Sequence, residues 1–488
     1  MTRKASLIIL ILVSIGVHFA FFGQPNEIVF DEVHFGKFVS AYYTHQYYFD
    51  IHPPGGKLII AGFAKILSAK GGPAFGGQPF NFTQIGQPFP DHKYLALRFL
   101  PILAGTLLPI IIYFLALELG FPTLGAFGAG ILVALENSLL TQSRYILLDP
   151  FLLLFGFTSL LFYLKYYNTN LSLTKGTFVN YKLWYNIFLM AVFGGLAASI
   201  KWTGLAFIGL AGIVELFKIA NYGLRITDQK ILHLLKNISK FIIFFVLIPF
   251  LIYFSIFTIH FSLLTKSGDG DAFMTPAFQK TLAGSAYAND TITKPLNVFQ
   301  KFIELNKEMY QANKTLTATH PYSSKWYTWP FMTRPIYYWN KTSTIHLEAQ
   351  PPSESRIYFI GNPFIWWAST VSILYLVFSI MYETLRNSVQ KYKIPDTRYL
   401  ILIGGWAINL LPFIGIGRVM FLYHYLSALI FAILALAYLI DQSKNSRKIW
   451  LLLLVISFLS FVYFAPLSYG LPLDATAFQH RLWLTTWQ

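Results

Sequence analysis

Side chains that could carry out acid–base or phosphate chemistry collect in a few short strings of this sequence. Two carboxylates stand next to each other at Asp31 and Glu32, and a second pair of polar residues, Asp50 and His52, precedes two prolines. A positioned carboxylate can take the proton from a hydroxyl group. Arginine recognises phosphate through forked, charge-assisted hydrogen bonds. The other members of these strings are Arg98, Arg144, Asp149, Lys201, His320, Arg418 and His424.

Metal and thiol chemistry have little support in the sequence. The chain has no cysteine, which removes disulfides, thiolate nucleophiles, iron–sulfur clusters and cysteine zinc sites. A helical turn would stack Asp31 on His34, three residues later, but no HExxH or other ligand spacing accompanies them. We therefore expect that no metal or other cofactor is required, and the sequence leaves a role for a divalent cation open.

The elements that must position these residues are membrane helices. Of the 488 residues 55% are hydrophobic and only 12% are charged, and the mean hydropathy is +0.52. A soluble protein of this size buries about three-quarters of its unfolded surface, which is too little to hide this apolar content. The net charge of +16 could suggest nucleic acid, but in so hydrophobic a chain it indicates membrane topology. We expect an all-α polytopic membrane protein whose partner is the lipid bilayer and not nucleic acid.

Eleven segments have the apolar character of membrane helices, which need about 20 mostly apolar residues. The first of them follows a short basic N-terminus and has no small-residue cleavage site, so we expect a retained anchor. The expected spans are about 5–23, 97–117, 123–138, 146–164, 184–200, 202–217, 241–260, 362–381, 399–416, 419–440 and 449–466.

The Lys and Arg distribution predicts how these spans are oriented. With a cytoplasmic N-terminus, the cytoplasmic segments hold 17 of the 37 basic residues in about 80 positions. Residues 24–96 and 261–361 then form two long extracytoplasmic loops. We expect one transmembrane domain, residues 1–466, that includes these loops, followed by an extracytoplasmic tail at 467–488.

In this topology every polar string lies on the outer face. A transporter would instead place ionisable residues at the bilayer midplane on opposed broken helices. The gathering at one face therefore favours catalysis, and a phosphate bound at a membrane edge suggests a lipid-phosphate substrate. The rival class is a polyprenyl-lipid transporter or a non-catalytic assembly subunit, which would tolerate Asp31→Asn.

Seven of the strings, in order between residues 30 and 426, resemble the dolichyl-phosphate-mannose–protein mannosyltransferases. The resemblance implies the C-type glycosyltransferase fold, with about eleven transmembrane helices and an active site under extracytoplasmic loops. It also implies an inverting transfer of mannose from polyprenyl (dolichyl) phosphate mannose to Ser or Thr hydroxyls of secreted or membrane proteins. The strings are Asp31–Phe38, Phe49–Pro54, Thr141–Asp149, His320–Tyr322 with Trp329-Pro330, Gly361–Pro363 with Trp366-Trp367, Gly404–Trp406, and Gly417-Arg418 with Phe421–Leu426.

The two adjacent carboxylates receive roles from this resemblance. Asp31 matches the catalytic carboxylate of the family, so we expect it to be the general base of a single displacement. A base of this kind contributes about 10²–10⁴ in rate. Glu32 is expected to orient the acceptor or to bind a cation.

Basic residues are the candidates for the donor phosphate, where negative charge grows as the donor leaves. Arg98 and Arg418 are the first candidates, with Arg144, Lys201 and His424 behind them. Arg144 could instead pair with Asp149, five residues later, and hold its loop together. The residues expected at the acceptor or in its loops are Asp50, His52, Asp149 and His320.

The chain departs from the family pattern at three places. Eukaryotic members carry a β-trefoil MIR domain in the second long loop, for which about 100 residues leave no room, so we expect a member from the cell membrane of a bacterium or archaeon. The family usually has Leu after the two prolines, where this chain has Gly55. It also commonly has a His pair followed by Pro, where this chain has Tyr423-His424 and Ser427.

The nearest alternative is another lipid-carrier-dependent sugar transferase, similar to the aminoarabinose transferases, that acts on a lipid or glycan acceptor. Those enzymes share an early Asp-Glu pair and a Pro-Pro loop. The His52-Pro53-Pro54 string and the string from Arg144 to Asp149 fit the protein-modifying family better.

Overall fold

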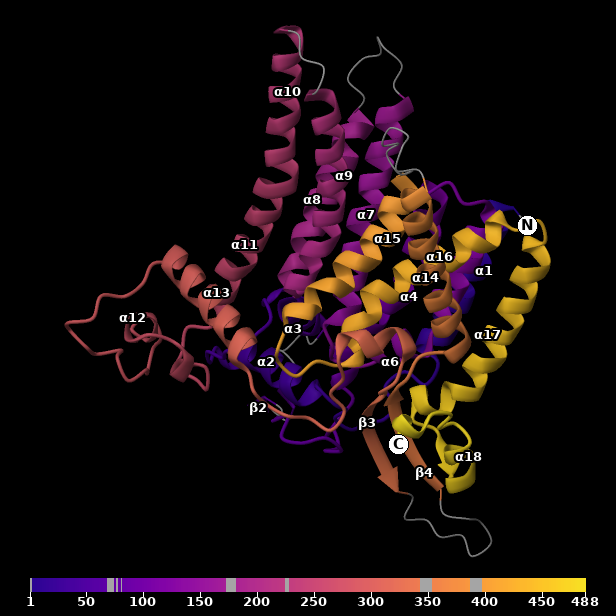
Figure 1. The fold of residues 1–488 in the computed structure, drawn as a ribbon. Coiled ribbons are helices and arrows are strands. Elements are labelled where there is room, and N and C mark those ends of the chain that lie inside the picture. The colour runs from indigo at the N-terminus through magenta and orange to yellow at the C-terminus, as the bar shows by residue number, and fades with distance from the viewer. Residues whose placement is uncertain are drawn as a thin grey trace, which may run out of the picture.

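Helices make up most of the structure, a computed structural model that describes residues 2–67, 74–75, 78–79, 81–172, 181–223, 228–342, 353–386 and 397–488 (Figure 1). The α-helices are α1 (Arg3–Phe19), α2 (Glu32–Thr44), α3 (Gly55–Leu67), α4 (Tyr94–Glu118), α5 (Thr123–Ala134), α6 (Asn137–Ser143), α7 (Asp149–Ser172), α8 (Tyr181–Ile200), α9 (Leu205–Gly223), α10 (Asp228–Phe241), α11 (Ile248–Leu263), α12 (Pro276–Gln279), α13 (Val298–Thr315), α14 (Pro363–Arg386), α15 (Thr397–Leu410), α16 (Leu426–Gln442), α17 (Ser446–Tyr469) and α18 (Ala475–Gln479). The strands are β1 (Ala74–Phe75), β2 (Gln78–Pro79), β3 (Ile336–Thr342), β4 (Ser353–Phe359) and β5 (Pro472–Asp474).

The apolar helices agree with the expected spans. Among the described residues nine helices are long and apolar enough to cross a membrane, and a bent pair adds a tenth candidate. The helix α1 has 17 residues, one fewer than the length used for that count, and coincides with the first expected span. Each of the eleven expected spans overlaps a helix of the structure. The predicted all-α polytopic architecture is therefore confirmed.

The third expected span, residues 123–138, is not one straight helix. The helix α5 ends at Ala134, and α6 begins at Asn137 after a bend of 58°. Glu136 stabilises the bend, because its carboxylate accepts hydrogen bonds from the backbone N–H groups of Leu139 (2.8 Å) and Asn362 (2.6 Å). One backbone donor of α6 and one from the segment before α14 are thereby paired inside an apolar bundle, where an unpaired donor is costly.

The centre of the bundle is α16, whose sequence is apolar all round. A helix of that kind is stable only when other helices surround it. In the segment Leu422–Gln442, 83% of the most apolar window is buried, and α5, α14 and α15 pack around it.

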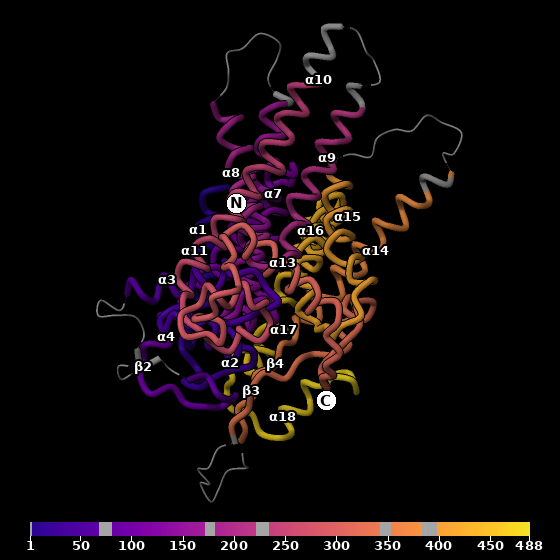
Figure 2. The backbone as a smooth tube through the Cα atoms, turned by 90° about the vertical axis from the view of Figure 1, so that its left-hand side faces the viewer, coloured from indigo at the N-terminus to yellow at the C-terminus, as the bar shows by residue number. Residues whose placement is uncertain are grey.

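The two long loops are folded, and their elements lie toward the same end of the molecule as the C-terminal residues (Figures 1 and 2). We call α2, α3, α12, α13, β3, β4, β5 and α18 the loop cap. In it β3, β4 and β5 form an antiparallel sheet in that order, with Ile336 opposite Phe359 and Ser353 opposite Asp474.

The C-terminal residues are part of this cap. The helix α17 continues to Tyr469, past the expected domain boundary at 466, and β5 then pairs with β4. Further on, the indole N–H of Trp487, a buried side chain, donates to the carbonyl of Met332 (2.8 Å). Residues 467–488 thus fold against the cap, and the expected domain boundary at 466 stays a prediction.

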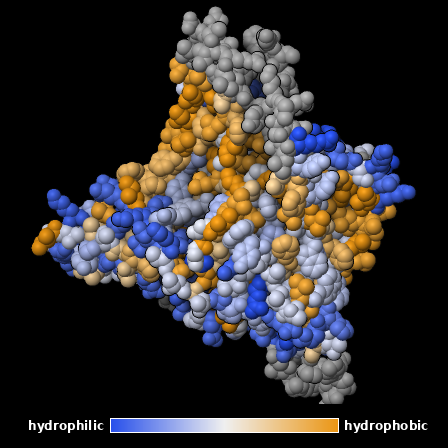
Figure 3. All heavy atoms as spheres, viewed as in Figure 1, coloured by the Kyte–Doolittle hydropathy of each residue, from blue (hydrophilic) through white to orange (hydrophobic). Residues whose placement is uncertain are grey.

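The surface fits a membrane protein. Apolar side chains cover much of the helical bundle in this view, and polar side chains are more frequent over the loop cap (Figure 3). The predicted orientation, with a cytoplasmic N-terminus, stays a prediction.

Candidate active site

Asp31 lies at the start of α2, where the loop cap meets the helical bundle. The preceding residue, Phe30, has a left-handed backbone (φ 46°), stacks on the ring of Tyr338 in β3 at 4.0 Å and donates its N–H to the Tyr338 carbonyl (3.2 Å). The half-buried Asp31 carboxylate makes no hydrogen bond or ion pair with any described residue. Burial raises the pKa of Asp31 to about 7; the cation Lys201 opposes this shift, and nearby carboxylates add to it. The geometry leaves this carboxylate open to a substrate.

The Glu32 carboxylate, in contrast, is hydrogen-bonded within the protein. Its buried carboxylate accepts hydrogen bonds from the backbone of Val29 (2.9 Å) and of Ile146 (2.9 Å), and from two nitrogens of Arg98 (2.8 and 2.6 Å). The expectation that Glu32 orients the acceptor or binds a cation does not fit this geometry, because its lone pairs are already used. Glu32 instead joins the loop before Asp31 to the turn before Asp149.

Arg98, expected to bind phosphate, is also committed within the protein. It is fully buried, and its remaining N–H groups donate to the carbonyls of Gly23, Pro25 and Glu27 (2.6–3.2 Å). All five donors of the guanidinium therefore have protein acceptors. The phosphate role is wrong for this structure, because no donor of Arg98 is left for a ligand.

Arg144 is likewise a structural residue. It donates to the carbonyls of His18, Ala20 and Phe21 (2.6–3.2 Å), and its guanidinium lies 4.7 Å from the ring centre of Tyr469. It does not pair with Asp149, so that expectation is contradicted. Its buried Nε has no hydrogen-bond partner among the described residues, and the expected phosphate role of Arg144 stays a prediction.

Asp149 and Lys201 form the ion pair of the site. Lys201 Nζ lies 2.8 Å from Asp149 Oδ1, and Gln142 donates to Asp149 Oδ2 (2.7 Å). The hydroxyl of Tyr338 in turn donates to Gln142 Oε1. This chain of contacts places Lys201, at the end of α8, and Asp149, at the start of α7, close to β3. The same strand contacts Phe30, the residue before Asp31.

A second ion pair supports the loop before α3. Lys57 pairs with Asp50 and donates to the carbonyl of His52 (2.9 Å), and both side chains of the pair are buried. Gly55 lets this loop approach α8 closely, since a Cβ there would lie 2.7 Å from the carbonyl oxygen of Ser199. Burial lowers the pKa of His52, and the surrounding cations Lys201, Arg418 and Lys57 lower it further, so the imidazole is neutral.

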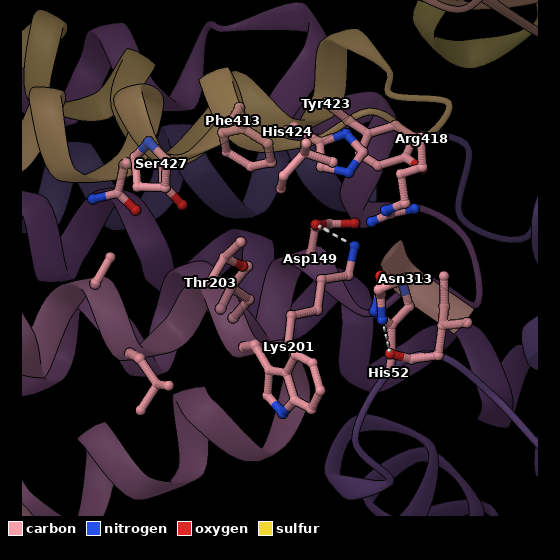
Figure 4. A pocket seen from close by; sticks show the side chains of 18 of the residues that line it. His52, Asp149, Lys201, Thr203, Asn313, Phe413, Arg418, Tyr423, His424 and Ser427 are labelled. Atoms are coloured by element: carbon pink, nitrogen blue, oxygen red, sulfur yellow. Dashed lines mark hydrogen bonds and ion pairs between the residues drawn. The ribbon is translucent and has the colours of Figure 1, made fainter. Parts of the chain in front are cut away.

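A cavity of about 630 Å³ lies beside these pairs. Its polar part contains Lys201, Arg418 and Asp149, whose side-chain ends point into one space with His52 and His424 close by (Figure 4). The guanidinium of Arg418 makes no hydrogen bond or ion pair with any described residue, and burial lowers its pKa. The apolar part is formed by Leu152, Leu153, Leu205, Ala206, Ile408, Pro412, Phe413 and Ile416. The cavity can therefore accept an anionic group at one end and an apolar chain at the other.

The other two histidines expected at the site, His424 and His320, differ in position. His424 has its Nδ1 at 2.9 Å from the backbone carbonyl of Phe421, and it lines the cavity. His320 does not line it; its Nδ1 accepts from the backbone of Tyr322 (3.2 Å), and its ring meets the edge of Phe421 at 5.0 Å. The expectation that His320 lies at the acceptor or in its loops stays a prediction.

No group of three or more His, Asp or Glu side chains in the described part of the chain could hold a metal ion. The expectation that no metal is required stays a prediction.

Several residues of the site escaped the sequence analysis. Lys57 follows the His52-Pro53-Pro54 string, and Gln142 stands inside the string that ends at Asp149, so position beside a motif was the available signal. Tyr338 and Asn313 had no such signal. Asn313 lines the cavity and donates to the carbonyl of Ile51 (3.0 Å) across 262 residues of sequence.

Comparisons with known proteins point to one family. A family model described as dolichyl-phosphate-mannose-protein mannosyltransferase matches residues 8–265, and one described as the C-terminal four TMM region of protein-O-mannosyltransferase matches residues 298–487. Protein O-mannosyltransferase 1 of Drosophila melanogaster is 35% identical over 293 residues, which cover 59% of this chain and 31% of that protein. For dolichyl-phosphate-mannose–protein mannosyltransferase 4 of Candida albicans the identity is 34% over 310 residues, which cover 62% and 39%. The chain thus spans between 31% and 39% of the length of these two relatives.

Solved structures agree in fold. The Saccharomyces cerevisiae protein O-mannosyltransferase Pmt1-Pmt2 complex bound to the sugar donor superposes with a TM-score of 0.85 at 22% identity, covering 100% of this chain and 93% of that chain. The apo oligosaccharyltransferase of Archaeoglobus fulgidus gives 0.53 at 14% identity, covering 99% and 57%. At these identities the likeness concerns the fold alone, which is that of the C-type membrane glycosyltransferases.

Proposed function

The chain belongs to the dolichyl-phosphate-mannose–protein mannosyltransferase family, and from this premise we propose that it transfers mannose from a polyprenyl-phosphate-mannose donor to Ser or Thr hydroxyls of proteins. We place the reaction on the extracytoplasmic face of a bacterial or archaeal cell membrane, with secreted or membrane proteins as acceptors. The Lys and Arg distribution supports this orientation.

The observation that carries the proposal is the unpaired Asp31 carboxylate, which does not line the amphipathic cavity itself but interacts electrostatically with Lys201 and Asp149, which do. In the proposed single displacement, the acceptor oxygen attacks the anomeric carbon of mannose while Asp31 takes the hydroxyl proton. The bond between the anomeric carbon and the phosphate oxygen breaks, and the polyprenyl phosphate leaves with the electron pair, so the anomeric configuration inverts. A base works best when its pKa is close to the working pH, and the pKa of Asp31, raised by burial to about 7, meets that condition.

The cavity supports a lipid phosphate as the leaving group. As a phosphodiester becomes a monoester its negative charge increases, and preorganised cations stabilise that change. Arg418 is the stronger candidate because its donors are uncommitted among the described residues, whereas Lys201 is shared with Asp149. His424 and the neutral His52 lie beside them, and the apolar wall suits the first isoprene units of the lipid.

The test is a transfer assay with purified protein, polyprenyl-phosphate-mannose and a Ser/Thr-rich peptide. We expect a hexose mass gain on the peptide and, by NMR, an anomeric configuration opposite to that of the donor. Asp31→Asn should abolish turnover while donor binding persists. The matched control Asp269→Asn, at an exposed aspartate of the second long loop, should keep full turnover. Transfer from a different polyprenyl-linked sugar but not from mannose would overturn the donor assignment. Full turnover by Asp31→Asn would overturn the mechanism.

A further inference from the structure

The second long loop contains a helix with an apolar face exposed on the protein surface. On α13, Phe299, Ile303 and Tyr310 are 53%, 51% and 55% exposed. Their spacing of four and seven residues puts them on one side of the helix. The opposite side, with Phe302 and Leu305, is buried against the protein. We call Phe299, Ile303 and Tyr310 the α13 stripe.

The stripe begins beside a membrane-spanning helix. The ring of Phe299 lies 6.1 Å from that of Phe254 in α11, and Phe302 packs on Phe250 (6.1 Å) and Phe257 (5.2 Å). In the span Leu234–Leu263, to which α11 belongs, only 17% of the most apolar window is buried. Figure 1 shows α13 beside the lower end of α11. The stripe is therefore continuous with a surface that must face lipid.

The polar groups of α13 suit the boundary between lipid and water. Its first turn is closed by a capping box, in which Asn297 and Gln300 each accept from the other's backbone N–H (2.9 Å), so these donors need no water. Two exposed lysines, Lys307 and Lys314, lie along the edge of the stripe. Lysines in this position extend to the lipid phosphates while aromatic and aliphatic side chains enter the apolar layer.

We propose that α13 is an interfacial helix, which binds the bilayer surface through the α13 stripe and its two flanking lysines. A lipid surface fits better than a protein partner because the stripe continues a lipid-facing helix without a break. The last turns of α13, with Tyr310, Asn313 and Lys314, also line the cavity. The C-terminal end of the stripe, with Tyr310 and Lys314, therefore lies at the rim of the cavity, and the proposal holds whether or not the proposed sugar transfer is correct.

The absence of cysteine allows a direct test, since one introduced cysteine is the only thiol in the chain. A nitroxide is attached at Ile303→Cys in protein reconstituted into bilayers, and its collisions with oxygen and with a water-soluble nickel chelate are measured by electron paramagnetic resonance. Val371→Cys, at a position 68% exposed in the span Pro363–Tyr382, is the lipid control. Asn340→Cys, at an exposed position of β3, is the water control.

We expect the Ile303 label to match the Val371 label, with high oxygen and low nickel accessibility. High nickel accessibility, as at Asn340, would place the stripe in water and overturn the proposal. Low accessibility to both reagents would also overturn it, because a second copy of the chain or another protein would then cover the face. Phe299→Cys repeats the measurement one turn away, so a local distortion at one position does not decide the outcome.

Discussion

Replacing Arg98 separates a structural residue from a phosphate ligand. In Arg98→Met the buried Glu32 carboxylate loses its counter-charge and two of its four hydrogen bonds. Removing one partner of a buried ion pair costs about 3–5 kcal/mol. We therefore expect a large fall in the free energy of unfolding, measured in detergent micelles, and unchanged affinity of the folded fraction for polyprenyl phosphate.

The conservative variant sharpens this prediction. In Arg98→Lys the charge remains, but an ammonium has three donors where the guanidinium uses five. Two buried acceptors are left without a partner, at about 1–3 kcal/mol each. A residue that only supplied charge to a phosphate would tolerate this change. The matched control is Lys93→Met at the start of α4, where an exposed pair with Asp91 (3.5 Å) contributes about 0–1 kcal/mol.

Removal of both charges completes the experiment. In Arg98→Met with Glu32→Gln no unpaired charge remains, so the double variant should lose less stability than the sum of the two single variants. The structural role is refuted if Arg98→Met unfolds like the wild type but binds polyprenyl phosphate at least about tenfold more weakly, a change of about 1.4 kcal/mol.

Three further outcomes follow from the site. Asp31 must be ionised to act as a base, so the rate of transfer should rise as the pH increases through about 7. Because folding raises the pKa of Asp31, its ionisation at alkaline pH lowers the free energy of unfolding. Asp31→Asn should therefore be inactive but at least as stable as the wild type in thermal melts at alkaline pH. Arg418→Ala should weaken the binding of polyprenyl phosphate, measured by titration, by about 10- to 100-fold. This factor corresponds to the loss of one charge-assisted hydrogen bond, about 1.5–3 kcal/mol. An unchanged dissociation constant would show that Arg418 does not bind the phosphate. Gly55→Leu should lower both stability and turnover, since a Cβ at 2.7 Å from the Ser199 carbonyl forces apart α3 and the end of α8. The matched control is Gly62→Leu in the same helix, where a Cβ has open space, and it should leave turnover unchanged. Wild-type melting and rate for Gly55→Leu would contradict the close contact.

The membrane spans could be predicted because their signal is local. The length of an apolar run decides whether it can cross the bilayer, and neither tertiary contacts nor ligands alter that length. The bend between α5 and α6 was missed because its cause is distant: the buried Glu136 binds a backbone N–H of Asn362, 226 residues later. The sequence shows that a glutamate is present, but it does not show which backbone N–H groups donate to it.

The candidate site was predicted only in part, because the sequence shows residue types and not the contacts that their side chains make. Asp31, Asp149 and Lys201 stand in family-like strings or at span ends, and the structure brings them close together. Arg98 and Arg144 have the same residue type and helix-end position as a phosphate ligand would. Only the three-dimensional contacts show that Glu32 and backbone carbonyls occupy every donor of Arg98, and that three backbone carbonyls accept from the two terminal nitrogens of Arg144.

The pairing of β5 with β4 has a consequence for biosynthesis. The residues that complete the sheet, Pro472–Asp474, follow the last membrane helix in the chain. Strand β3, which holds Phe30 next to Asp31, pairs with β4 in the same sheet. A nascent chain that has emerged only as far as α17 can insert its helices but lacks the third strand and the Trp487 contact. Completion of the sheet beside Asp31 therefore requires residues 472–487, which are translated after the helix α17.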